Sequence, residues 1–98
     1  MHAVVQTYLS KGEGSRSEIR VRPLPGQGIS TDTRVECSKQ VRRQHPVGQM
    51  FLIPVNWKHA EGKESCLYVS YREPDQMVPI THDQAMEFIK ATFGKAHG

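Results

Sequence analysis

The clearest hydrophobic pattern in the chain lies between residues 49 and 71 and predicts a β-hairpin. An apolar run at 50–55 is followed by Trp57, a polar segment of eight residues and a second apolar and aromatic run at 67–71. Side chains on a strand alternate between its two faces, and residues that oppose each other in an antiparallel pair share a face. The pattern therefore predicts a buried ladder that pairs Trp57 with Leu67, Val55 with Val69 and Ile53 with Tyr71.

Three other segments have the composition or the alternation of strands. Residues 2–9 are rich in β-branched and aromatic side chains, and in residues 18–22 and 33–37 apolar positions alternate with charged ones. The first two segments are predicted to form a hairpin. Residues 23–28 cannot lie inside a sheet, because their prolines lack the N–H that a ladder needs, so we expect a mobile crossing loop there.

Two segments have helix signals. Residues 38–44 are predicted to form one short helical turn that begins at a serine cap. Near the C-terminus, Thr81 and Gln84 have the spacing of a capping box, in which each side chain bonds the backbone N–H of the other residue. Gly94 is a natural helix stop, so we expect a helix at 81–93. Apolar residues recur within it at helical spacing and predict a buried stripe: Ala85, Met86, Ile89 and Phe93.

These elements predict one small α+β domain that spans residues 1–98. Five β-segments precede a single terminal helix, an order typical of this class. We expect a bent antiparallel β-sheet or a small β-barrel of about five strands, with the C-terminal α-helix packed across an end or an open face. The chain length, 98 residues, is within the ordinary range of one domain.

The sequence also predicts a soluble, cytoplasmic protein. Its longest apolar run is far shorter than the roughly 20 residues of a membrane span, and its first residues lack the basic start and cleavage site of a signal peptide. Thiols stay reduced in the cytoplasm, so Cys37 and Cys66 are expected to be buried free cysteines rather than a disulfide. The five histidines lie in separate segments and no Cys-x-x-Cys pair is present, so we predict no metal site and no cofactor.

Positive charge is concentrated in the first half of the chain. Residues 1–49 carry eight basic and four acidic side chains, whereas residues 50–98 carry five and six. This asymmetry favours contact with an anionic partner, although a solvated charged surface has the same composition. Our first interpretation is a non-catalytic binding module whose ligand, a nucleic acid or a protein partner, lies across a sheet face or barrel mouth. The candidate ligand-binding residues are Arg20, Arg22, Arg34, Arg42, Arg43 and Tyr68.

Two other functions fit the same sequence. A small ribonuclease-type enzyme needs a base and a cation near the scissile phosphate. The candidate residues for that chemistry are His45, Arg42, Arg43 and Tyr71. A structural or oligomerising protein needs no ligand. The outward strand face that carries Met50, Leu52 and Tyr68 is half apolar, so it would serve as a homodimer surface unless the terminal helix covers it.

Overall fold

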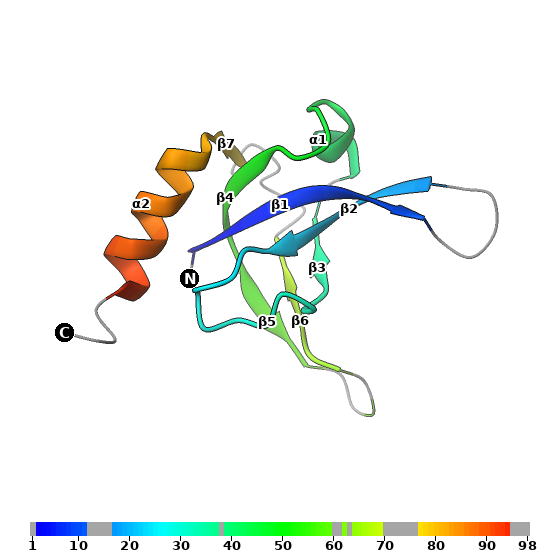
Figure 1. The fold of residues 1–98 in the computed structure, drawn as a ribbon. Coiled ribbons are helices and arrows are strands. Elements are labelled where there is room, and N and C mark those ends of the chain that lie inside the picture. Colours follow the sequence, from blue (N-terminus) through cyan, green and yellow to red (C-terminus); the bar gives the residue numbers. More distant parts are fainter. Residues whose placement is uncertain are drawn as a thin grey trace.

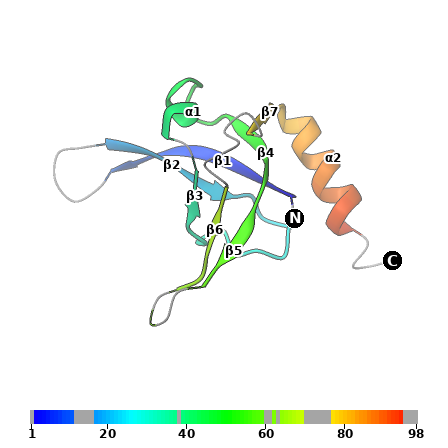
Figure 2. The same ribbon diagram turned by 180° about the vertical axis from the view of Figure 1, so that it is seen from behind.

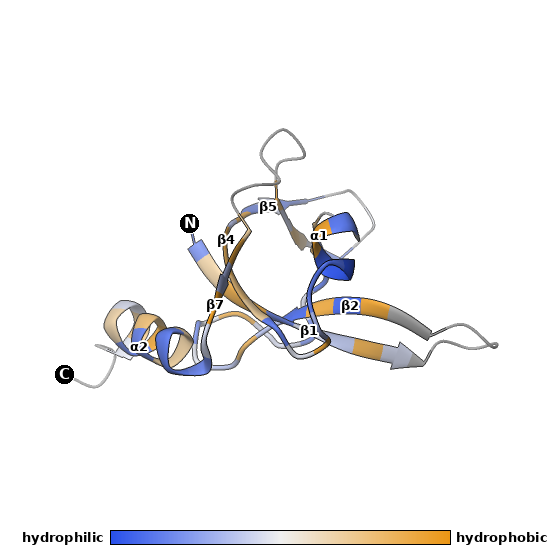
Figure 3. Ribbon diagram, turned by 90° about the horizontal axis from the view of Figure 1, so that it is seen from above, coloured by the Kyte–Doolittle hydropathy of each residue, from blue (hydrophilic) through white to orange (hydrophobic). Residues whose placement is uncertain are grey.

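The computed structural model describes residues 2–11, 17–37, 39–59, 62, 64–69 and 77–94. These residues form seven strands in two sheets and two helices, and both sheets contribute to one core (Figure 1). In chain order the elements are β1 (His2–Lys11), β2 (Ser17–Pro23), β3 (Val35–Glu36), α1 (Lys39–Arg43), β4 (Met50–Pro54), β5 (Asn56–Lys58), β6 (Cys66–Tyr68), β7 (Val78–Ile80) and α2 (His82–Phe93). The predicted α+β class with a C-terminal helix is confirmed, and the described strands form two sheets rather than one closed barrel. α2 lies outside the two sheets, on the side of β4 and β7 (Figure 3).

The larger sheet is antiparallel, in the order β2-β1-β4-β7. β1 and β2 form the predicted hairpin, in which Tyr8 opposes Arg20. Ala3, Val4 and Val5 are all fully buried, although successive side chains point to opposite faces of a strand. Both faces are covered here, because the smaller sheet packs on one side of β1 and α2 packs on the other (Figure 2).

The two halves of the predicted hairpin at 49–71 lie in different sheets. β5 pairs with β6 in the predicted register, with Trp57 opposite Leu67. β4 pairs with β1 and β7, and the residue at position 71, the predicted partner of Ile53, lies outside the described residues. The chain passes from one sheet to the other at Pro54 and Val55, where Pro54 has no N–H to donate (Figure 2). The smaller sheet has the order β3-β6-β5, with β3 parallel to β6.

Trp57 is 43% exposed, so its predicted burial is wrong. Its cross-strand partner Leu67 is fully buried, and Val69, which was predicted to be buried, is so. β5 and β6 extend away from the larger sheet as a two-stranded arm (Figure 1), and Trp57 belongs to β5 of this arm. Its ring stacks on His59, with the ring centroids 6.1 Å apart and the planes 20° apart.

α2 begins and ends where the sequence predicts. The Thr81 hydroxyl accepts from the N–H of Gln84 at 3.1 Å, and the Gln84 side chain accepts from the N–H of Thr81 at 2.9 Å. This is the complete capping box. Gly94 is the C-cap, and its N–H bonds the carbonyl oxygen of Lys90. Local sequence signals are therefore sufficient to place both ends of this helix.

The buried stripe of α2 is narrower than predicted. Ala85 is fully buried, and Phe88 and Ile89 pack with it against the larger sheet. Met86 is 40% exposed, so its predicted burial is wrong. A residue next to Ala85 lies about 100° further around the helix. Because the contact with the sheet is a narrow line, Met86 falls outside it.

Replacing Thr81 by alanine should lower the free energy of unfolding by about 1 kcal/mol, because the N–H of Gln84 loses its acceptor. Thr81→Ser keeps the hydroxyl and is the matched control. Urea denaturation followed by circular dichroism measures both variants. A serine variant as unstable as the alanine variant would contradict the capping role.

The loop between β2 and β3 is held to the sheet by Gln27, whose side chain is 2% exposed. Its Oε1 accepts from the N–H of Val4 at 2.7 Å, and its Nε2 donates to the carbonyl oxygens of Val4 at 2.8 Å and Leu24 at 2.9 Å. Gly26 has a φ of +89°, and a Cβ built on it would meet Ile89 Cγ2 at 3.3 Å. The segment expected to be a mobile crossing loop is therefore anchored to both β1 and α2.

Cys37 and Cys66 are buried free thiols, as predicted. Burial raises the pKa of the Cys37 thiol, and the nearby Arg42 guanidinium acts in the opposite direction. Neither helix of the described residues is long and apolar enough to cross a membrane.

Candidate functional site

The outer face of the larger sheet brings two of the predicted arginines together with a tyrosine. The register of β1 and β2 places Tyr8 opposite Arg20 and Gln6 opposite Arg22. The Arg22 guanidinium carbon lies 4.9 Å from the centroid of the Tyr8 ring. Arg20 and Arg22 are exposed, and Tyr8 is half-buried. We call these four residues, Gln6, Tyr8, Arg20 and Arg22, the arginine–tyrosine face.

This face is open because α2 covers only part of the sheet. Val4 and Leu52 lie on the same side of the sheet as Tyr8, and both belong to the cluster that packs against α2. β1 then runs away from α2 towards the β1–β2 hairpin, so the helix does not lie over this part of the strand (Figure 1). On the opposite face of the hairpin, Thr7 of β1 and its partner Val21 of β2 are both buried. The strands that carry the arginines are therefore packed on their inner side.

The chemistry of the arginine–tyrosine face suits an anionic ligand that has flat rings. A guanidinium over a tyrosine ring is attracted to the negative face of the ring, which holds the cation in place. Its planar fork of N–H groups matches the oxygens of a phosphate, and its flat side can stack on a base. The face thus presents stacking surfaces and phosphate donors side by side.

The other predicted residues lie elsewhere. Tyr68 is in the smaller sheet, where it opposes Asn56 on one side and Glu36 on the other. Glu36 forms an ion pair with Lys58 at 3.5 Å, so this surface carries a balanced pair of charges. Arg34 is exposed just before β3, a strand of the same sheet. These two residues therefore belong to a different part of the fold from the β1–β2 hairpin that carries Arg20 and Arg22.

The residues proposed for ribonuclease-type chemistry make packing contacts around α1. Arg42 donates from Nη1 to the carbonyl oxygen of Ile19 at 3.0 Å and so connects α1 to β2. The His45 ring lies edge-on to the buried ring of Phe51, with centroids 5.0 Å apart and planes at 85°. Arg43 is exposed on the same short helix. The fourth residue of this group, at position 71, lies outside the described residues.

The surface considered for a homodimer divides between the two sheets. Met50 and Leu52 are half-buried and pack in the cluster that contains Ala85 of α2. Tyr68 belongs to β6 of the smaller sheet. The helix therefore covers part of this surface, which was the structural alternative that the sequence left open.

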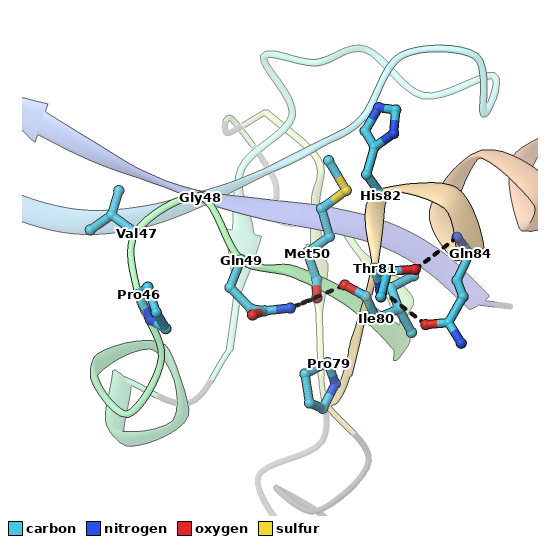
Figure 4. A pocket seen from close by; sticks show the side chains of 10 residues that line it. All are labelled: Pro46, Val47, Gly48, Gln49, Met50, Pro79, Ile80, Thr81, His82 and Gln84. Atoms are coloured by element: carbon cyan, nitrogen blue, oxygen red, sulfur yellow. Dashed lines mark hydrogen bonds between the residues drawn. The ribbon is translucent and has the colours of Figure 1, made fainter.

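A pocket of about 510 Å³ lies between the N-terminus of α2 and the segment before β4 (Figure 4). The Gln49 side chain crosses its base and donates from Nε2 to the carbonyl oxygens of Met50 at 2.9 Å and Ile80 at 3.1 Å. These bonds hold β4 and β7 together at the pocket. The lining residues are Pro46, Val47, Gly48, Gln49, Met50, Pro79, Ile80, Thr81, His82 and Gln84.

The sequence interpretation missed both Tyr8 and this pocket. Alternation along residues 2–9 places Gln6 and Tyr8 on one face, so the tyrosine was accessible to the same reasoning that found Arg20 and Arg22. The pocket was not accessible in this way, because its two walls are about thirty residues apart in sequence and meet only through the pairing of β4 with β7. Among the described residues, no group of three His, Cys, Asp or Glu side chains is placed to hold a metal ion.

Comparison with known proteins identifies no family for this chain. No protein-family model, curated protein or solved structure shows a significant match to the chain.

Proposed function

We propose that this protein is a non-catalytic module that binds single-stranded nucleic acid across the outer face of β1 and β2. The observation that carries this proposal is that Tyr8 lies opposite the exposed Arg20 and under the exposed Arg22 on an open sheet face. Proteins that bind single strands combine cationic grooves, which follow the phosphates, with aromatic side chains on which bases stack. Arg20 and Arg22 contact phosphates, and the Tyr8–Arg22 pair stacks on a base.

The charge of the chain supports this ligand. The excess of basic residues lies in residues 1–49, which contain both strands of the face. Glu36, an acid of the same half, pairs with Lys58 on the smaller sheet, and this reduces its effect on the arginines. The contacts of His45 and Arg42 favour binding over hydrolysis, since acid–base catalysis needs such groups directed at the substrate.

Titration of fluorescently labelled oligonucleotides of about ten nucleotides tests the proposal. DNA and RNA strands of the same sequence are compared, because both carry the phosphates and bases that the face recognises. The affinity should fall with salt by roughly 0.7 log units per log unit of salt for each phosphate neutralised. The double variant Arg20→Ala/Arg22→Ala should flatten this slope by about 1.4, the contribution of two phosphates.

The matched control is Arg34→Ala/Arg43→Ala, which removes two exposed arginines outside the arginine–tyrosine face. Both double variants have the same net charge, so a larger effect of Arg20→Ala/Arg22→Ala reports position rather than total charge. Equal effects of the two double variants would contradict the site. The absence of binding by the wild-type protein at tens of micromolar and low salt would contradict the function itself.

A further inference from the structure

One row of residues connects the arginine–tyrosine face to the pocket at α2. Arg22 opposes Gln6, Gln6 opposes Met50, and Met50 opposes Ile80, so the row crosses all four strands of the larger sheet on one face. Neighbouring strands are about 4.8 Å apart, which places Met50 roughly 10 Å from Arg22 along the row. Gln6 also donates from Nε2 to the carbonyl oxygen of Gly48 in the pocket wall at 3.2 Å. A nucleic-acid strand that is bound at Arg22 therefore needs only a short extended segment to reach the pocket.

The pocket differs from the arginine–tyrosine face in charge. Of its described lining residues, none is Lys, Arg, Asp or Glu, and only His82 is titratable. Asp83 lies next to it in the first turn of α2, with Oδ1 3.8 Å from His82 Nδ1, and offsets the attraction of the helix N-terminus for an anion. Phosphates are thus favoured at the arginines, whereas the pocket, which has no Lys or Arg in its lining, suits a neutral group.

The apolar and polar groups of the lining match those of a nucleobase. Met50, Ile80 and Pro79 supply apolar surface from two paired strands, and Thr81 and Gln84 supply polar groups at the helix end (Figure 4). A base has two apolar faces and a polar edge, so one face can rest on the apolar part of this lining while the edge meets the polar part. A volume of about 510 Å³ is within the range of small-molecule sites and holds a purine as well as a pyrimidine.

We infer that this pocket binds one nucleobase of the strand that lies on the arginine–tyrosine face, and that it prefers a purine. The inference rests on the proposed function. The row through Gln6 and Met50 guides the strand from the arginines to the pocket. A purine is preferred because its second ring buries more of the apolar lining than a pyrimidine does.

The test introduces a charge into the pocket and compares it with the same charge nearby. Val47 lines the pocket and is 50% exposed, whereas Val78 does not line it and is 48% exposed. The variants are Val47→Glu and Val47→Lys, with Val78→Glu and Val78→Lys as matched controls. For each protein, the Kd is measured for labelled adenine-only and thymine-only DNA strands of equal length, and their ratio is taken. Self-stacking of the adenine strand affects every protein equally and cancels between them.

Wild-type protein and both Val78 variants should have the same ratio of the two Kd values. Both Val47 variants should lower the preference for adenine about fivefold. This factor corresponds to roughly 1 kcal/mol of additional apolar burial by the larger base. The glutamate should weaken and the lysine should strengthen total affinity, so a common loss of preference cannot arise from charge. Salt-dependent binding with the same ratio in all five proteins would overturn the pocket and leave the proposed function intact. If the wild type binds neither strand, both proposals are overturned.

Discussion

Replacing Phe51 by alanine is expected to lower the free energy of unfolding by about 3–5 kcal/mol, the range for truncation of a buried aromatic residue. Phe51 is fully buried on an inner strand of the larger sheet, where it opposes Val5 on β1 and Pro79 on β7. The ring also supports His45, which packs edge-on against it. Alanine would leave a cavity between the two sheets that strands paired on both sides cannot close. The expected loss is a large part of the roughly 5–15 kcal/mol that stabilises a domain.

Leu9→Ala is the control for this prediction. Leu9 is on the same face of β1 as the core residues, but it is 49% exposed because the β1–β2 hairpin extends beyond the smaller sheet. Its truncation should therefore cost less than about 1 kcal/mol. Urea denaturation followed by far-ultraviolet circular dichroism compares the two variants. Similar losses at positions 51 and 9 would show that the core is not centred where the structure has it.

Replacing Gln27 by leucine should lower the free energy of unfolding by about 2–4 kcal/mol, because the loss includes a buried N–H left without an acceptor. Beyond Pro23, where β2 ends, the Gln27 amide bonds both the N–H and the carbonyl oxygen of Val4, and this oxygen also accepts from the N–H of Leu24. Leucine has a similar volume, so its main effect is the loss of three hydrogen bonds rather than a cavity. Urea denaturation measures the effect. A loss below about 0.5 kcal/mol would show that these contacts are incidental.

Gln27→Glu examines the same contacts through pH. The introduced carboxylate can accept from the N–H of Val4, but it lies against the carbonyl oxygens of Val4 and Leu24, which disfavour its charge. Its pKa should therefore be higher in the folded than in the unfolded protein. The folded state then binds the proton more tightly, so stability relative to wild type should be greatest below about pH 4 and should decline as the pH rises. A difference from wild type that does not change with pH would contradict this geometry.

Part of the candidate site follows from the sequence and part does not. Strict alternation was enough to place Arg20 and Arg22 on one outward face of their strand. The tyrosine beside them was expected to be Tyr68, but the pairing of β1 with β2 brings Tyr8 to the arginines instead. Strand pairing joins segments that are distant in sequence, so the face of one strand does not reveal its neighbours. The pocket likewise could not be predicted from the sequence, because its two walls meet only when β4 pairs with β7.

Local sequence patterns predicted the β1–β2 hairpin, the pairing of β5 with β6 and both ends of α2, because strand alternation and helix capping act between residues close together in the chain. The capping box at Thr81 and the pairing of Trp57 with Leu67 are of this local kind. Packing between distant segments, in contrast, divides the predicted hairpin between two sheets at Pro54 and leaves Trp57 exposed on β5. The same packing decides which face stays open, because burial depends on what covers a surface. α2, about eighty residues after β1 in the chain, covers Val4 and leaves the arginine–tyrosine face exposed to solvent.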